Sequence, residues 1–196
     1  MARPRKFNEE EVLDAAARCF WTRGFDGTSL RGLSENTGLT GASLYNAFGD
    51  KRALYRKTLD RYVADSIVER IARCETLPPR TAIDAFFAEV IQRSLDDSDR
   101  KGCMLINAAL EIAPHDAGFQ DVVATTLFEM EAFFRRQIVA GKADGTIMAS
   151  QSADDLARHL LGVLVGMRVL ARIRPERALL EGIVAPALAL LGVPKE

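Results

Sequence analysis

Polar side chains able to bind phosphate oxygens gather between residues 28 and 51 of the chain. Six of these residues are the candidates for contacts: Thr28, Thr40, Ser43, Tyr45, Asn46 and Lys51. Hydroxyl and ammonium groups are common ligands of a phosphodiester backbone, and an asparagine amide can pair with the edge of a base. These residue types therefore predict a surface that approaches a polyphosphate, on which the hydroxyls and Lys51 would position the chain.

A second group able to do chemistry follows Arg100 and Lys101. Cys103 stands at an expected helix start, where the helix dipole and the two cations can favour a reactive thiolate. The alternative is a small buried apolar residue, the usual role of a free cysteine.

Cys103, Asn107 and His115 are also the residue types of a cysteine hydrolase. Their order and spacing match no such signature, and no oxyanion loop is evident, so we predict no enzyme.

The composition indicates a globular protein. The chain has 196 residues, of which 48% are apolar and 27% charged, and its net charge is −1. Such a balance permits a sizeable core. Residues 1–62 hold 11 basic and 8 acidic side chains, so they sum to +3 and the remainder to −4. The sign of this asymmetry suits an N-terminal segment that approaches phosphate.

The cysteines and the apolar runs predict the cellular compartment of the protein. Cys19, Cys74 and Cys103 are odd in number and lack the paired spacing of a zinc site or a disulfide framework. We therefore expect a reducing cytoplasm and neither a metal nor another cofactor. The first residues lack the apolar run of a signal peptide. The longest apolar run, Leu160–Met167, is well short of the ~20 residues of a membrane span, so we expect a soluble protein without a membrane partner.

The elements that position the polar residues are expected to be helices. Helical periodicity runs along almost the whole chain, and no segment alternates as a strand would, so we predict an all-α protein of about nine helices. Asn8 and Glu11 form a capping box at the first helix. Two short helices follow, capped by Thr28 and by Thr40, with Gly38 at the turn between them.

Two short helices joined by a glycine-containing turn, and supported by a preceding helix, form a helix-turn-helix arrangement, whose second helix lies in the major groove of double-stranded DNA. The outer face of that helix is expected to be slim because it carries small residues, namely Gly41, Ala42 and Ser43. Arg3 and Arg5 precede the first helix and can reach along the backbone or into a minor groove.

The chain divides into two expected domains. Residues 1–50 would form the DNA-binding domain, and residues 51–196 a ligand-binding and dimerisation domain, with a helix over 51–73 linking the two. The last two helices, over about 152–173 and 176–192, are apolar on nearly all sides, and Gly162 and Gly166 permit close helix approach. Such helices predict a homodimer in which a second copy covers part of this surface.

Large apolar side chains gather in the middle of the chain. Six of them are candidates for a ligand pocket: Phe86, Phe87, Met104, Phe119, Phe128 and Phe133. For any one of these residues plain core packing is the commoner role, whereas their combined size and the flexible methionine favour a pocket. No charge pattern indicates the polarity of the ligand.

Residues 7–55 resemble the DNA-binding region of the tetracycline-repressor (TetR) family. The matching stretch is FWTRGFDGTSLRGLSENTGLTGASLYNAFGDKRALY. The resemblance implies a homodimer of all-helical subunits, an N-terminal lobe that binds a palindromic operator, and a larger lobe in which a small ligand releases the DNA. It also implies a role for seven residues: phosphate contacts from Thr28, Thr40, Tyr45 and Lys51, and base contacts from Gly41, Ala42 and Asn46.

Two local features refine the resemblance. Gly41 stands where members often carry Lys or Arg, which removes a bidentate guanine reader, so base specificity should depend on Asn46, on Ala42 and on DNA shape. Further along, the chain is similar to a Gly-Cys subgroup through Gly102, Cys103, Asn107 and Glu111. Some members of that subgroup sense electrophiles or oxidants through cysteine, which makes Cys103 a possible sensor.

We therefore expect a DNA-binding repressor that leaves a palindromic operator when a small ligand binds or a cysteine is modified. The alternative is a protein-interaction module with a degenerate helix-turn-helix that does not bind DNA. Gly41 and the modest +3 charge of residues 1–62 support that alternative. Salt-dependent binding to a promoter separates the two.

Overall fold

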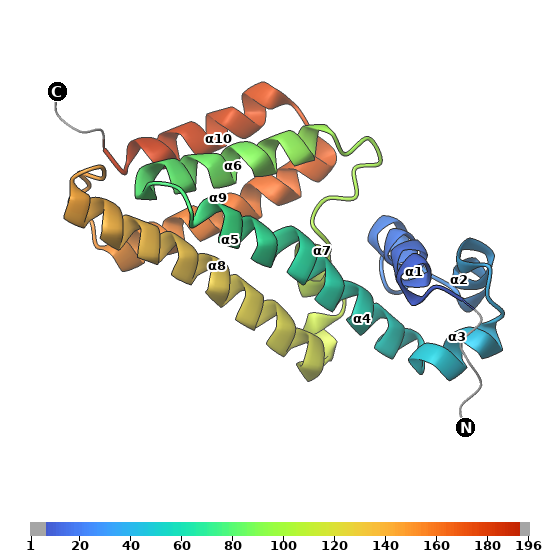
Figure 1. Cartoon of the computed structure of the whole chain (residues 1–196). Helices are drawn as coiled ribbons and strands as arrows, with labels where there is room; N and C mark the ends of the chain where they lie inside the picture. Colours follow the sequence, from blue (N-terminus) through green and yellow to red (C-terminus); the bar gives the residue numbers. More distant parts are fainter. Residues whose placement is uncertain (1–6, 193–196) are drawn as a thin grey trace.

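The computed structural model describes residues 7–192, and its regular elements there are helices (Figure 1). The ten α-helices are α1 (Glu9–Arg23), α2 (Leu30–Thr37), α3 (Gly41–Phe48), α4 (Lys51–Val63), α5 (Glu69–Cys74), α6 (Pro79–Leu95), α7 (Met104–Glu111), α8 (Ala117–Asp144), α9 (Ala153–Ile173) and α10 (Arg177–Ala189). A π-helical turn, η1 (Ala64–Val68), joins α4 to α5 without a break, and η2 (Ala113–His115) is a 3₁₀ turn. Counting α4, η1 and α5 as one rod, this part of the chain has nine α-helical rods, which confirms the all-α prediction.

Side-chain caps begin the N-terminal helices much as the sequence predicts. The Asn8 side chain accepts from the Glu10 backbone N–H at 3.1 Å, and its amide donates to Glu11 at 3.1 Å. Thr40 accepts from the backbone N–H of Ser43, and so begins α3. These caps bond N–H groups that would otherwise lack partners in the first turn.

The predicted cap of α2 is wrong by one residue. Ser29 is the cap, and its hydroxyl accepts from the Gly32 backbone N–H at 3.1 Å. The Thr28 hydroxyl instead donates to the carbonyls of Gly24 at 2.7 Å and Cys19 at 3.2 Å. Thr28 therefore closes the C-terminal end of α1 and does not open α2.

A continuous hydrophobic core joins the three N-terminal helices to the larger lobe. Tyr55 of α4 is buried at the junction, where its ring lies 4.8 Å from the ring of Phe20 and 5.3 Å from that of Phe119, between centroids. Figure 1 shows the rod of α4, η1 and α5 running from this head into the larger lobe. The predicted linking helix is thus present, and it continues to Cys74.

The larger lobe is a stack of long helices. The 28-residue α8 packs on α9 and on α6, and α10 covers α6 and α9 on the other side (Figure 1). The loop between α6 and α7 approaches the side of α1, as the Figure 1 trace shows. Within residues 7–192, no helix combines the length and the apolar character needed to cross a membrane.

Candidate nucleic-acid interface and ligand cavity

The third helix has one buried face and one open face. Leu44 and Phe48 are buried against the core of the head, whereas Ala42, Tyr45 and Asn46 are exposed, with Tyr45 39% accessible. A helix seated in this way presents a slim, uncharged surface to whatever approaches the head. The geometry that a groove-binding helix needs is therefore available on α3.

Hydroxyl and ammonium groups flank that open face. The Thr40 and Ser43 hydroxyls lie 2.9 Å apart at the start of α3. The ammonium of Lys51, in the first turn of α4, lies 4.4 Å from the centroid of the Phe25 ring. In the described part of the chain Lys51 has neither a hydrogen bond nor a carboxylate partner. Its charge is therefore free to meet a phosphate.

Two predicted contacts need correction or qualification. Thr28 has no accessible surface and its hydroxyl bonds two carbonyls, so the predicted contact of its side chain with phosphate is wrong. A Cβ on Gly41 would lie 2.9 Å from Cδ2 of Leu30, so glycine allows α3 to lie close to α2. Gly41 thus has a packing role beside any contact with a base. Arg3 and Arg5 lie outside the described residues.

A cavity of about 330 Å³ lies in the larger lobe, next to the head. Its apolar wall includes seven side chains: Ile67, Phe86, Val90, Ile106, Met130, Leu164 and Val165. Trp21 of α1 and Tyr62 of α4 also line it, so the cavity touches both the head and the linking helix. A mostly apolar cavity with a few converging polar groups is typical of a small-molecule site.

The predicted ligand residues lie mostly elsewhere. Phe86 lines the cavity, whereas Phe87 lines a separate hollow between α6 and α10. Met104 and Phe133 are buried in the core, and Phe119 stacks on Tyr55 between the lobes. Phe128 is 66% exposed on the outside of α8. Of the six predicted residues, Phe86 is the one that lines this cavity, because packing and not residue type decides which aromatic ring meets a cavity.

Cys103 lines the same cavity. It is 8% exposed, and the Tyr62 hydroxyl donates to its sulfur at 3.4 Å. Burial, together with the neighbouring Cys103, raises the pKa of the Tyr62 phenol, so the phenol keeps its proton and remains a donor at neutral pH. A molecule in the cavity would therefore lie beside a thiol whose hydrogen-bond partner is fixed.

The sequence interpretation missed Trp21, Tyr62, Arg70 and Arg168 as cavity residues. Arg168 had a usable signal, because it is the one charged residue in the apolar stretch LLGVLVGMRVL. A charge within such a helix usually faces a polar partner or a cavity. Trp21 carried a weaker signal as the single tryptophan of the chain.

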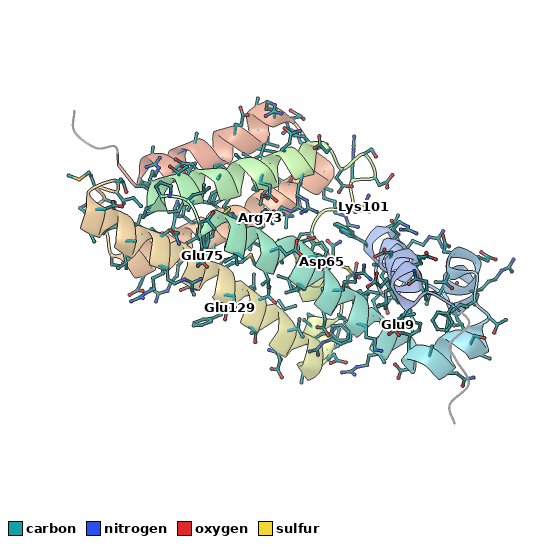
Figure 2. All side chains as sticks on the ribbon, in the orientation of Figure 1. Glu9, Asp65, Arg73, Glu75, Lys101 and Glu129 are labelled. Carbon is teal, nitrogen blue, oxygen red and sulfur yellow. The ribbon has the colours of Figure 1, made fainter. Side chains whose placement is uncertain are left out.

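Two polar junctions, together with a hydrogen bond from the Phe25 backbone N–H to the Glu111 carboxylate at 2.9 Å, fasten the head to the larger lobe. At the first, the carbonyl oxygen of Gly102 accepts from the Trp21 indole at 3.2 Å and from Arg168 at 2.5 Å. Figure 2 labels the neighbouring Lys101, whose ammonium lies 5.7 Å from the Trp21 ring centroid. Gly102 directly precedes Cys103, so this junction forms one edge of the cavity.

At the second junction, the start of α4 is paired with the start of α8. The Arg52 guanidinium donates to both oxygens of the Asp116 carboxylate, and Arg56 donates to the Gly118 carbonyl at 3.0 Å. The hydrogen bond from Arg52 lowers the pKa of Asp116 to about 2. The carboxylate is therefore ionised at neutral pH and keeps the pair intact.

Within residues 7–192, no three His, Cys, Asp or Glu side chains are grouped as a metal ion would require.

Known proteins resemble this chain along nearly its full length. The family described as bacterial regulatory proteins, tetR family, matches residues 12–58, and the tetracyclin repressor-like C-terminal domain matches residues 79–185. The HTH-type transcriptional repressor ComR of Escherichia coli is 28% identical over 172 residues, covering 87% of this chain and 82% of ComR. The uncharacterized HTH-type transcriptional regulator YezE of Bacillus subtilis is 26% identical, covering 97% of this chain and all of YezE.

Solved structures of TetR family regulators also resemble this chain. A cysteine mutant of the TetR family transcriptional regulator CifR, complexed with double-strand operator DNA, has a TM-score of 0.84 and is 32% identical over 95% of this chain and 98% of its own. The reduced form of Escherichia coli NemR has a TM-score of 0.81 at 19% identity, over 95% of this chain and 98% of NemR, which indicates a shared fold.

Proposed function

Because the chain belongs to the tetR family of bacterial regulatory proteins, and is thus a DNA-binding transcription regulator, we propose that it is a homodimeric repressor released from its operator at the cavity beside Cys103. The open face of α3, flanked by an unpaired Lys51, is the observation that carries this proposal. ComR is a repressor and CifR binds operator DNA, and both support the same role here.

DNA reading would divide between two sets of residues. Thr40, Tyr45 and Lys51 would hold phosphates, while Ala42 and Asn46 would meet base edges in the major groove. Residues 1–50 would form the reading domain and residues 51–196 the domain that dimerises and binds the ligand. The continuous core through Tyr55 supports a head that moves with its linking helix.

The outer faces of α9 and α10 fit the expected homodimer. Along α9 the exposed residues include Gly162, Gly166, Val169 and Ile173, the last of which is 67% exposed. A Cβ at Gly162, Gly166 or Gly182 would meet no other atom within 4 Å, so these faces are flat and open. An apolar face of this kind on two adjacent helices suits burial against a second copy.

Release would act through the two junctions of the head. A molecule in the cavity, or an adduct on Cys103, would press on Tyr62 of the linking helix and on Gly102, which holds Trp21. Either change favours a different head position only if the molecule binds that position better. The distance between the two reading heads of a dimer would then no longer match the operator.

The protein would work in the cytoplasm, where its DNA lies, and without catalysis of its own. The relatives are transcription regulators and carry no enzyme name. The mild charge of the head would suit an interaction module without DNA binding, but membership of the family favours the regulator.

Binding to DNA tests the proposal. Purified full-length protein is mixed with genomic fragments, and the bound DNA is sequenced, which should yield one palindromic motif. The Tyr45→Ala, Lys51→Ala double variant should keep its fold and its dimer and lose that binding. Salt-independent binding, recovery of random DNA, or a folded double variant that still binds as the original protein does would overturn it.

A further inference from the structure

The cavity beside Cys103 carries an unbalanced set of charges. Its lining includes four cationic side chains, Arg70, Arg93, Lys101 and Arg168, and two carboxylates, Asp96 and Asp97. The ammonium of Lys101 lies 3.1 Å from Asp97 and 2.9 Å from Asp99, and Asp96 is exposed and accepts from the Gln92 amide. Glu89, behind the wall, pairs with Arg70 at 3.0 Å and lies 4.0 Å from Arg93. Of the four cations, Arg168 is the one that has no carboxylate partner in residues 7–192.

Arg168 bonds only to neutral groups in residues 7–192. One terminal nitrogen donates to the Ser94 hydroxyl and the other to the Gly102 carbonyl, each at 2.5 Å. No carboxylate in this part of the chain lies within 4.0 Å of it. A guanidinium has five N–H donors, so three remain unused on a half-buried group that lines the cavity.

The polar groups share one cavity. Arg70 and Arg168 line it together with Tyr62, whose hydroxyl donates to the Cys103 sulfur at 3.4 Å. The rest of the wall is hydrocarbon, with Phe86, Met130 and Leu164 among its members. The cavity thus has a cationic end and an apolar body.

We infer that the effector of this cavity is a small organic acid, whose carboxylate binds the free N–H donors of Arg168 and whose hydrocarbon body packs on the apolar wall. A carboxylate matches the planar donor fork of a guanidinium and supplies the missing negative charge. A neutral or cationic molecule of the same shape would leave Arg168 uncompensated in a cavity that has lost its water. The inference rests on the proposed function in that it takes the cavity to be the effector site.

Trp21 provides a direct measurement of occupancy. It is the single tryptophan of the chain and lines the cavity, so its fluorescence reports binding without any DNA present. The probes are 3-phenylpropionate and octanoate, each compared with its primary amide and with the amine of equal chain length. We expect both acids to bind at least about tenfold more tightly than their amides, and the amines not to bind, since hydrogen bonds to a charged group contribute more than neutral ones.

Three variants assign the effect to one residue. Arg168→Gln should reduce acid affinity about tenfold or more and leave amide affinity unchanged, while Arg168→Lys, which keeps the charge without the fork, should lie between. Arg172→Gln is the matched control, because Arg172 lies one turn further along α9, bonds Asn107 and does not line the cavity. It should bind the acids as the original protein does.

Several results would overturn the inference: equal binding of acid and amide, tighter binding of an amine, an unchanged acid affinity in Arg168→Gln, or no acid bound at about 1 mM. These results are independent of the proposed function, because the titrations contain no DNA. A protein that binds no operator but prefers the acids would refute the repressor and keep the acid site, and a protein that binds its operator but shows no acid preference would do the reverse.

Discussion

Lys51→Gln should change the salt dependence of DNA binding by a predictable amount. Lys51 is unpaired in the described part of the chain, so the substitution removes a charge and strands no carboxylate. Each phosphate contact contributes about 0.9 to the slope of log K against log salt, so a dimer that loses two contacts should lose about 1.8 from that slope. The same relation predicts about 60-fold weaker binding at about 0.1 M salt and almost no difference near 1 M.

Fluorescence anisotropy of a labelled operator, measured over a salt series, supplies both slopes. The Phe25 ring beneath the ammonium contributes only about 0.5–1 kcal/mol at an exposed site, so the variant should stay folded. Lys142→Gln is the control of equal charge, because Lys142 lies at the far end of α8 and bonds the Gln151 carbonyl. An unchanged slope in Lys51→Gln, or an equal fall in Lys142→Gln, would refute a local phosphate contact.

Three further predictions concern single residues. Thr28→Val should cost about 1–3 kcal/mol in urea unfolding, because two carbonyls lose their buried donor, and should leave operator affinity of the folded protein unchanged. Asp116→Asn should make the thermal stability of the protein depend less on pH in the acid range, as measured by thermal unfolding. The fold lowers the pKa of Asp116 from 3.8 to about 2, so the ionised carboxylate stabilises the fold above pH 3.8, and this stabilisation is lost as the pH falls toward about 2. Ile173→Glu should give a folded monomer by analytical ultracentrifugation and circular dichroism, since it places a charge on the open apolar face of α9.

Local chemistry explains why the head could be predicted closely from the sequence. A cap needs a side-chain oxygen immediately before a helix, and Thr40 is such a residue at the predicted position. Asp50 and Ser152 cap α4 and α9 in the same way. The error at α2 has the same origin, because Thr28 and Ser29 are neighbouring hydroxyls and both suit a cap. Only the position of α1, whose final carbonyls lie within reach of Thr28, decides between them.

The cavity could not be predicted in this way. Phe86, Phe119 and Phe128 are alike in the sequence, yet one lines the cavity, one packs between the lobes and one is exposed. Their positions depend on how α8 crosses α6 and α4, which is a property of tertiary packing. Polar residues within apolar stretches, such as Arg168, are the better sequence signal, because burying them requires a partner.

The two junctions give a physical reason for a ligand to move the head. The head and its linking helix are held at Gly102 through Trp21, at Asp116 through Arg52, and at Glu111 through the Phe25 backbone N–H. Several separate attachments fix an orientation, and a change at one of them favours another orientation. A carboxylate on the free N–H donors of Arg168 would bind the guanidinium that also donates to the Gly102 carbonyl, the atom that accepts from Trp21, and so would act at the first junction. A small charge at the cavity would thereby change how the head is held, and with it the distance between the two α3 helices of a dimer.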